Sequence, residues 1–244
     1  MGMRLLVESE LLDEVSPTLP PDAAKHLRVL RVKAGEAVEL FDGKGAYRKY
    51  EVQSADTKAP RLCAVGERQV QPRGVSSLVL FACVTKGSRW DWTIEKATEL
   101  GATKIVPVIS SRTIVRLTSS ERAAKRERWQ RIAEDAARQS DAKWIPEIVE
   151  AMDFEATLQL VKATNTFIGA LTEPPPPMIV DALMATKDKT DLAVYVGPEG
   201  DFSPEELAAL MKVATPVSFG SMILRAETAA IFALSVLSAF KEAK

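Results

Sequence analysis

Hydrophobic and polar residues alternate along the first part of the chain, a pattern typical of strands with one buried face. The alternation is clearest at 36–41 (EAVELF) and resumes at 46–52, and Asp42-Gly43 between them is a strong hairpin signal. Shorter stretches predict further elements: strands at 5–8 and 61–70, and at 21–30 a short helix that runs into a strand. Several short strands without long helices favour a small β-barrel, which we assign to residues 1–72.

From residue 73 onward, apolar runs of strand length alternate with longer segments of helical periodicity. Strands are predicted at 76–84, 104–109, 145–149, 166–171, 192–196 and 216–219. Helices are predicted at 89–100, 118–139, 153–162, 179–185 and 226–240, with one more beginning at Ser203. This alternation is typical of a parallel sheet with helices on both faces. The sequence therefore predicts an α/β fold, in which residues 73–244 form a second domain with a mostly parallel sheet.

Two loops near the carboxyl end of the chain stand out within this second domain. The strand at 192–196 runs into Gly-Pro-Glu-Gly at 197–200, and Ser203 and Glu206 then have the spacing of a capping box. The strand at 216–219 leads through the loop 220–222 into the long apolar helix. Because neighbouring loops at the carboxyl ends of parallel strands form a ligand crevice in open α/β sheets, we expect a binding site here.

Charge is distributed unevenly, although the formal net charge of the whole chain is only −1. Residues 86–131 hold eleven Lys or Arg against five acids, and 147–206 hold twelve acids against three Lys. This asymmetry favours one basic face for a polyanion, and the alternative is a solvated helix face. Cys63 and Cys83 lie in apolar strands without CxxC spacing, which is typical of reduced thiols in a cytosolic protein.

Several common sites do not fit these residues. A single histidine and no Cys/His cluster make a zinc site improbable, so no metal is expected. The segment 84–88 (VTKGS) has neither the glycines of a dinucleotide loop nor the order of a Walker loop. The amino-terminal stretch lacks a signal-peptide pattern and no apolar run reaches membrane length, so we expect a cytoplasmic protein without membrane contact. What remains is a ligand held mainly by backbone groups, with a purely structural turn as the alternative for GPEG.

Two segments together carry a resemblance to a known family: 192–203 (LAVYVGPEGDFS) and 222–229 (MILRAETA). They resemble the SPOUT class of S-adenosylmethionine-dependent RNA methyltransferases, and within it the family that methylates N3 of a uridine in small-subunit (16S) ribosomal RNA. Further segments agree in the same order: 26–31 (HLRVLR), 41–45 (FDGKG), 96–101 (KATELG), 128–129 (RW) and 137–140 (ARQS). The likeness covers nearly the whole chain.

The resemblance implies a PUA-like amino-terminal barrel that binds RNA, a carboxyl-terminal α/β domain with a trefoil knot, and a homodimer. It also implies that S-adenosylmethionine lies between three segments. These cofactor contacts map to Leu171, Thr172, Gly197, Pro198, Glu199, Gly200, Phe219, Gly220, Ser221, Met222, Ile223 and Leu224. The implied partner is small-subunit ribosomal RNA or the assembled small subunit. The alternatives are a methyltransferase for another base or RNA, and a non-catalytic RNA-binding dimer.

Methylation at N3 of uracil requires loss of the imide proton, and negative charge then develops on O2 and O4 of the base. Arg225, directly after the second loop, is the candidate that stabilises this charge, with an ion pair to Glu227 or Glu199 as the alternative. Glu227 is the second catalytic candidate, either as a helix cap or as a group that orients Arg225. Candidate phosphate contacts are Arg28, Arg31, Lys86, Arg89, Arg112 and Arg116.

Three positions depart from the family pattern. Asp201 stands where the family usually has a second glycine, and Ala226 stands where it has threonine. The family also has a more basic pair near 141–143 (DAK). Asp201 is the departure closest to the expected cofactor loop, where it alters the conformation of the loop or adds a charge near the cofactor.

Overall fold

A computed structural model describes residues 3–54, 60–161, 165–186 and 191–243. The chain divides into two compact units. The first consists of residues 1–73 together with 137–145, and the second of residues 74–136 together with 146–244. Segment 137–145 is far from the rest of the first unit in the sequence, and no pattern in the sequence predicts that it belongs to this unit.

The first unit is built on a five-stranded sheet in the order β1 (Met3–Leu6), β2 (Ala37–Phe41), β3 (Ala46–Ser54) and β4 (Arg61–Ala64), with β5 (Gln69–Val70) also paired to β3. The pair β1 and β2 is parallel, and the other pairs are antiparallel. The hairpin predicted around Asp42 is confirmed: Asp42 Oδ1 accepts hydrogen bonds from the backbone N–H groups of Lys44 and Ala46, at 2.7 and 3.0 Å. Two short helices complete the unit: the 3₁₀ helix η1 (Ser9–Asp13) and α1 (Pro21–Val29).

Three predictions for this unit are wrong in their extent, and the first is the strand expected at 5–8, which is β1 at Met3–Leu6. The single strand expected at 61–70 is two strands, β4 and β5, because the chain turns between them at Gly66, whose φ of 101° suits glycine. The helix at 21–30 does not run into a strand, since Arg31 adopts a φ of 53°. The buried side chains of β1, β2, β3 and α1 nevertheless form one apolar core, as the alternation predicts.

Segment 137–145 is held in the first unit by the side chain of Arg4, which is 7% exposed. Its Nη1 donates to the carbonyl of Ala137 at 2.8 Å, and its Nη2 donates to that of Ala142 at 3.0 Å. The same guanidinium lies 4.0 Å from the ring centroid of Phe41 and forms an ion pair with Glu39. One buried arginine therefore joins the first strand to a segment more than 130 positions away.

The second unit contains a seven-stranded sheet in which every pairing is parallel, which confirms the predicted α/β fold with a mostly parallel sheet. Its order is β12 (Thr215–Val217), β10 (Asn165–Gly169), β11 (Leu192–Val196), β6 (Leu78–Cys83), β7 (Lys104–Ile109) and β8 (Glu147–Ile148), with β9 (Met152–Asp153) also paired to β7. The central strands β6 and β11 are almost wholly buried because helices cover both faces of a parallel sheet.

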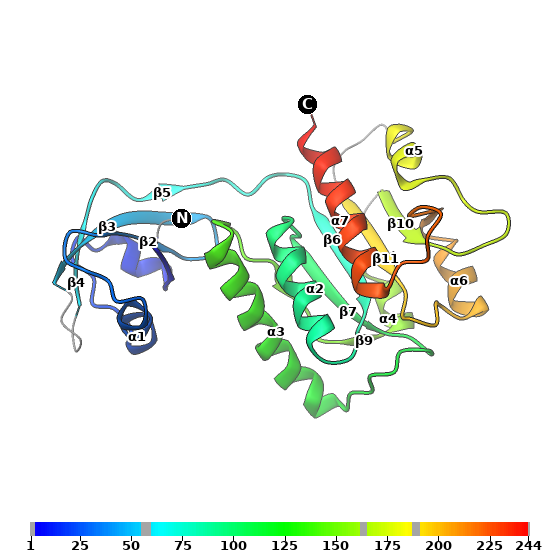
Figure 1. Cartoon of the computed structure of the whole chain (residues 1–244), viewed down its shortest axis with the longest axis horizontal. Helices are drawn as coiled ribbons and strands as arrows, with labels where there is room; N and C mark the ends of the chain where they lie inside the picture. The colour runs from blue at the N-terminus through cyan, green and yellow to red at the C-terminus, as the bar shows by residue number, and fades with distance from the viewer. Residues whose placement is uncertain (1–2, 55–59, 162–164, 187–190, 244) are drawn as a thin grey trace. The chain divides into compact units, whose positions relative to one another are not determined.

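Six helices accompany this sheet in the described part of the chain: α2 (Ser88–Glu99), α3 (Ser119–Gln139), α4 (Phe154–Leu158), α5 (Ile179–Met184), α6 (Pro204–Leu210) and α7 (Ala226–Glu242). Helices α2 and α7 lie side by side, and α7 packs on β6 and β11 (Figure 1). Phe154 of α4 and Leu210 of α6 pack in a core with Tyr195 of β11. None of the helices in the described residues has the length and apolar character needed to cross a lipid bilayer.

The helix predicted from Asp153 to about 162 is shorter than expected. Helix α4 ends at Leu158, and residue 162 lies outside the described residues. Asp153 occupies the N-cap position but makes no side-chain cap bond, because its carboxylate forms an ion pair with Arg122 at 2.6 Å. The cap predicted at Ser203, in contrast, is confirmed with both bonds of the capping box present.

Candidate functional site

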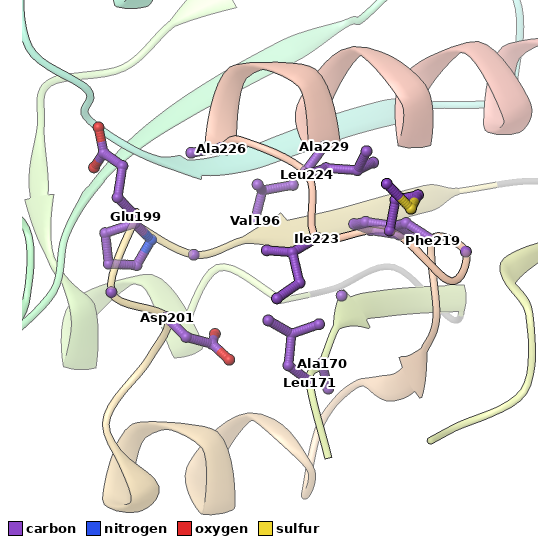
Figure 2. A pocket seen from close by; sticks show the side chains of 16 residues that line it. Ala170, Leu171, Val196, Glu199, Asp201, Phe219, Ile223, Leu224, Ala226 and Ala229 are labelled. Atoms are coloured by element: carbon purple, nitrogen blue, oxygen red, sulfur yellow. The ribbon is translucent and has the colours of Figure 1, made fainter. Parts of the chain in front are cut away.

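A cavity of about 350 Å³ lies at the carboxyl ends of β10 and β11. Three segments and the first turn of α7 surround it (Figure 2). The lining residues are Gly169, Ala170, Leu171, Val196, Gly197, Pro198, Glu199, Gly200, Asp201, Phe219, Gly220, Met222, Ile223, Leu224, Ala226 and Ala229. A cavity of this size at the carboxyl edge of a parallel sheet is suited to a small organic ligand.

The first wall is a tight turn directly after β11. The N–H of Asp201 donates to the carbonyl of Pro198 at 2.9 Å and thereby closes the turn. Asp201 itself has a φ of 58°, in the left-handed region where glycine is favoured. Its Oδ1 accepts a hydrogen bond from the N–H of Phe202 at 2.7 Å. The turn is therefore closed by its own backbone, and the aspartate side chain adds one hydrogen bond at its exit.

The capping box fixes the exit of this turn into α6. Ser203 Oγ accepts from the N–H of Glu206 at 3.2 Å, and Glu206 Oε2 accepts from the N–H of Ser203 at 2.9 Å. The second oxygen of Glu206 accepts from the N–H of Ser111 at 2.7 Å, in the loop after β7. Glu206 is only 7% exposed, so its carboxylate connects the end of the turn after β11 to the loop after β7 from a buried position.

The second wall is the loop after β12. Ser218 Oγ exchanges hydrogen bonds with the backbone of Gly220, whose φ of 124° suits glycine. The ring of Phe219 lies over Gly169 at the end of β10, where an added Cβ would be 2.4 Å from Cε2 of the ring. The same ring packs against Phe232 of α7, with 5.9 Å between the ring centroids. Gly169 therefore allows the aromatic wall to approach the strand.

Ten of the twelve residues predicted as cofactor contacts line this cavity. Thr172 and Ser221 are not on the lining, and the hydroxyl of Thr172 donates instead to the carbonyl of Pro174 at 3.1 Å. Sequence reasoning missed five small or apolar lining residues, Gly169, Ala170, Val196, Ala226 and Ala229. They lie at strand ends and in the first turn of a helix, where a small residue has no distinct signal in the sequence.

Two arginines predicted to contact RNA are bonded to the first wall. Arg89 forms an ion pair with Glu199 at 3.0 Å. Arg112 Nη1 donates to the carbonyl of Gly200 at 2.8 Å and, more weakly, to that of Phe202 at 3.4 Å. The turn after β11 is thus supported by the first turn of α2 and by the loop after β7, as well as by its own bonds.

The other predicted RNA contacts lie apart from the cavity lining. Arg116 donates to the carbonyls of Ser110 and Ser111 at 3.1 and 2.8 Å, and so stabilises the loop after β7. Lys86 is exposed in the loop between β6 and α2. In the first unit, Arg28 and Arg31 are exposed at the end of α1 and just after it.

The two predicted catalytic residues begin α7. Arg225 is its N-cap residue and is exposed, and within the described residues its side chain makes no ion pair. The alternative pairing of Arg225 with Glu199 is not found, because Glu199 pairs with Arg89. Glu227 is 8% exposed, and its Oε2 has no hydrogen-bond partner among the described residues.

The charged groups on the cavity lining are both acids, Glu199 and Asp201. Most of the remaining lining is apolar side chain or glycine, which leaves backbone N–H and C=O groups near the cavity. This combination suits an uncharged heterocycle attached to a cationic group. No group of three or more His, Cys, Asp or Glu side chains that could hold a metal ion is found among the described residues.

Comparison with known proteins supports the resemblance found in the sequence. Residues 73–238 match the model of the RNA methyltransferase domain, and 19–62 match that of the RNA methyltransferase PUA domain. The chain is 32% identical to the ribosomal RNA small subunit methyltransferase E of Synechocystis sp., over 99% of this chain and 79% of the relative. It is 30% identical to the Bacillus subtilis protein of the same name, over 87% of this chain and 85% of the relative.

Two solved structures cover 98% of this chain and 98% of their own. A putative methyltransferase from Legionella pneumophila, in complex with bound S-adenosylmethionine, has a TM-score of 0.86 and 28% identity. A ribosomal RNA small subunit methyltransferase E from Neisseria gonorrhoeae, bound to S-adenosyl methionine, has a TM-score of 0.84 and 26% identity. The parallel sheet, its cavity and the matched domains together define an RNA methyltransferase. This chain belongs to the ribosomal RNA small subunit methyltransferase E family, which confirms the resemblance found in the sequence.

Proposed function

We propose that this protein transfers a methyl group from S-adenosylmethionine to N3 of a uridine in small-subunit ribosomal RNA. Membership of the family supports the reaction class, and the named relatives support the RNA. The observation that carries the proposal is the cavity between the ends of β10 and β11 and the loop after β12. Its position and size suit a cofactor held by backbone groups, and two solved relatives carry S-adenosylmethionine.

The cofactor contacts that we propose are the ten predicted residues that line the cavity: Leu171, Gly197, Pro198, Glu199, Gly200, Phe219, Gly220, Met222, Ile223 and Leu224. Gly197 and Gly200 leave the backbone of the first wall accessible, and the closed turn keeps it in one conformation. When bound, S-adenosylmethionine supplies an electrophilic methyl group on a sulfonium. The protein contributes by orienting that group and by restricting the access of water.

Arg225 is the proposed catalytic residue. As N3 of uracil loses its proton, negative charge spreads onto O2 and O4, and a guanidinium near these oxygens stabilises it. The side chain of Arg225 is exposed at the start of α7 and makes no ion pair within the described residues, so it is available to a substrate. Glu227 is the proposed positioning residue, because its buried carboxylate retains one oxygen for a further partner.

For the RNA partner we propose phosphate contacts by Arg28, Arg31, Lys86, Arg89, Arg112 and Arg116. Arg28, Arg31 and Lys86 are exposed, whereas the other three also support the loops of the site. The proposal includes a PUA-like barrel for the first unit, a knotted carboxyl-terminal segment and a homodimer. It also places the protein in the cytoplasm, with ribosomal RNA or the assembled small subunit as its partner.

The proposal is tested by mapping the methyl group. Small subunits and free small-subunit RNA are each incubated with the protein and isotopically labelled S-adenosylmethionine, then digested and analysed by mass spectrometry. We expect one labelled nucleoside, 3-methyluridine, at a single position. Label in a different nucleoside would instead favour a methyltransferase for another base. No label and no calorimetric uptake of the cofactor would favour a non-catalytic RNA-binding protein.

A further inference from the structure

Asp201 ends the turn of the first wall in a backbone conformation that favours glycine. Its φ is 58°, a region that side chains other than those of Asn and Asp seldom occupy. The aspartate therefore adds a side chain to a conformation that glycine adopts at least as easily.

The carboxylate of Asp201 is held at the wall of the cavity. Its Oδ1 accepts from the N–H of Phe202 at 2.7 Å and lies 3.2 Å from the position that a Cβ on Gly197 would take. Figure 2 shows the side chain directed toward Leu171, across the lower part of the cavity. Its neighbour Glu199 extends in the opposite direction, away from Leu171.

The two acids of the lining differ in their partners. Glu199 forms an ion pair with Arg89, which offsets its charge. Asp201 forms no ion pair within the described residues, and its one hydrogen bond is to a neutral backbone N–H. Arg112 binds the carbonyls of Gly200 and Phe202, but not the Asp201 carboxylate. No Lys or Arg is among the described residues that line the cavity, so Asp201 supplies a negative charge that has no ion-pair partner there.

The methyl donor and its product differ by one unit of charge. S-Adenosylmethionine carries a sulfonium, an ammonium and a carboxylate, whereas S-adenosylhomocysteine has a neutral thioether in place of the sulfonium. As the methyl group passes to N3, the carbon–sulfur bond breaks and its electron pair stays on sulfur. The base has lost its N3 proton to solvent, so the positive charge of the ligand disappears within the pocket.

We propose that Asp201 makes this cavity selective for the cationic methyl donor over its neutral product. The proposal rests on the proposed use of S-adenosylmethionine and adds a specificity-determining residue to the cofactor site. A carboxylate on the wall attracts the donor but has no net charge to attract in the product. Because the wall is partly exposed to solvent, we expect the charge to contribute about threefold to tenfold in relative affinity.

The test is calorimetric titration of the wild type and Asp201→Asn with three ligands: S-adenosylmethionine, S-adenosylhomocysteine and sinefungin. Sinefungin carries an amine in place of the sulfonium and is therefore cationic. Asparagine tolerates positive φ and retains a carbonyl oxygen for the Phe202 N–H, so the substitution removes the charge and leaves the turn. We expect weaker binding of both cations by about threefold to tenfold, with the dissociation constant of the product nearly unchanged.

A matched control is Asp191→Asn. Asp191 also has a positive φ, 50°, and precedes the same strand β11 at its other end, where it binds the N–H and hydroxyl of Ser77. This variant should retain the wild-type ratio of affinities. Asp201→Gly is a second test variant, because glycine suits the backbone and also removes the charge; a thermal melt checks that each variant is folded.

The ionic strength of the titration provides an independent measure. Selectivity for the cations should decrease with added salt in the wild type and change little in Asp201→Asn. If the ratio of cation to product affinity is the same in both Asp201 variants as in the wild type, the role of Asp201 is overturned. The methyltransferase proposal then remains intact. If the wild type binds neither S-adenosylmethionine nor S-adenosylhomocysteine, the proposed function itself is overturned.

Discussion

Replacement of Gly169 by alanine tests whether the close approach of Phe219 to β10 shapes the cavity. An added Cβ would lie 2.4 Å from Cε2 and 2.7 Å from Cζ of the Phe219 ring. Carbon atoms in contact are normally separated by about 3.5 Å, so the ring must retreat by about 1 Å. Phe232 of α7 lies against the same ring, which restricts movement on that side.

This movement should affect ligand binding in the cavity more than the stability of the fold. Phe219 is only half-buried and the clash involves the far end of its side chain, so the ring can swing where the wall is open. Insertion of a methyl group into a tightly packed site lowers the free energy of unfolding by about 1–3 kcal/mol. Because the ring can move, we expect a loss of about 1 kcal/mol for Gly169→Ala. A wall displaced by about 1 Å should weaken binding of S-adenosylmethionine by about tenfold, since complementary contacts are lost.

Calorimetric titration and thermal unfolding together measure the two effects. Gly74→Ala is the matched control, because an added Cβ at Gly74 meets nothing within 4 Å and its backbone does not require glycine. The decisive comparison is a double-mutant cycle with Phe219→Ala. Once the ring is absent, Gly169→Ala should cost little further affinity, whereas fully additive losses would refute the proposed contact between ring and strand.

Three further predictions follow from individual side chains. Arg225→Ala should leave the affinity for S-adenosylmethionine within a few-fold, because Arg225 does not line the cavity, while single-turnover methyl transfer falls by about a hundredfold or more; unchanged transfer would remove it from catalysis. Ser203→Ala breaks the bond to the Glu206 N–H and should lower the free energy of unfolding by about 1 kcal/mol in denaturant titration. Burial raises the pKa of Cys83 to about 11, so at pH 8 a disulfide reagent should label only the half-buried Cys63 until the protein is unfolded, and rapid labelling of both thiols would contradict this.

The elements that the sequence predicted well are those determined by local signals. Strand β7 has the predicted bounds, and α6 begins at the capping box formed by Ser203 and Glu206. Asp42-Gly43 marks the observed hairpin. Most of the cavity lining was also predictable, because it lies on loops that directly follow apolar strands, and the resemblance to a family identified which loops these are.

The parts that could not be predicted depend on contacts between distant segments. Nothing local indicates that Arg89 pairs with Glu199, or that Glu206 reaches the backbone of Ser111. Asp153 has the residue type and position of an N-cap, but the tertiary ion pair with Arg122 takes its carboxylate. Single-sequence signals describe which bonds a residue can make, whereas the fold decides which of the competing bonds is formed.

Substitution of Asp201 removes its charge, and the other bonds of the turn after β11 decide whether the structure of the turn is kept. The Asp201 side chain holds one backbone donor, the N–H of Phe202. The turn itself is closed by the backbone bond from Asp201 to Pro198, and its exit is held by the reciprocal bonds of Ser203 and Glu206. None of these other bonds uses the Asp201 carboxylate, so its removal leaves the turn closed and the cap intact. A change in ligand selectivity on substitution at this position therefore reports on the charge, because the wall that carries it is maintained by other groups.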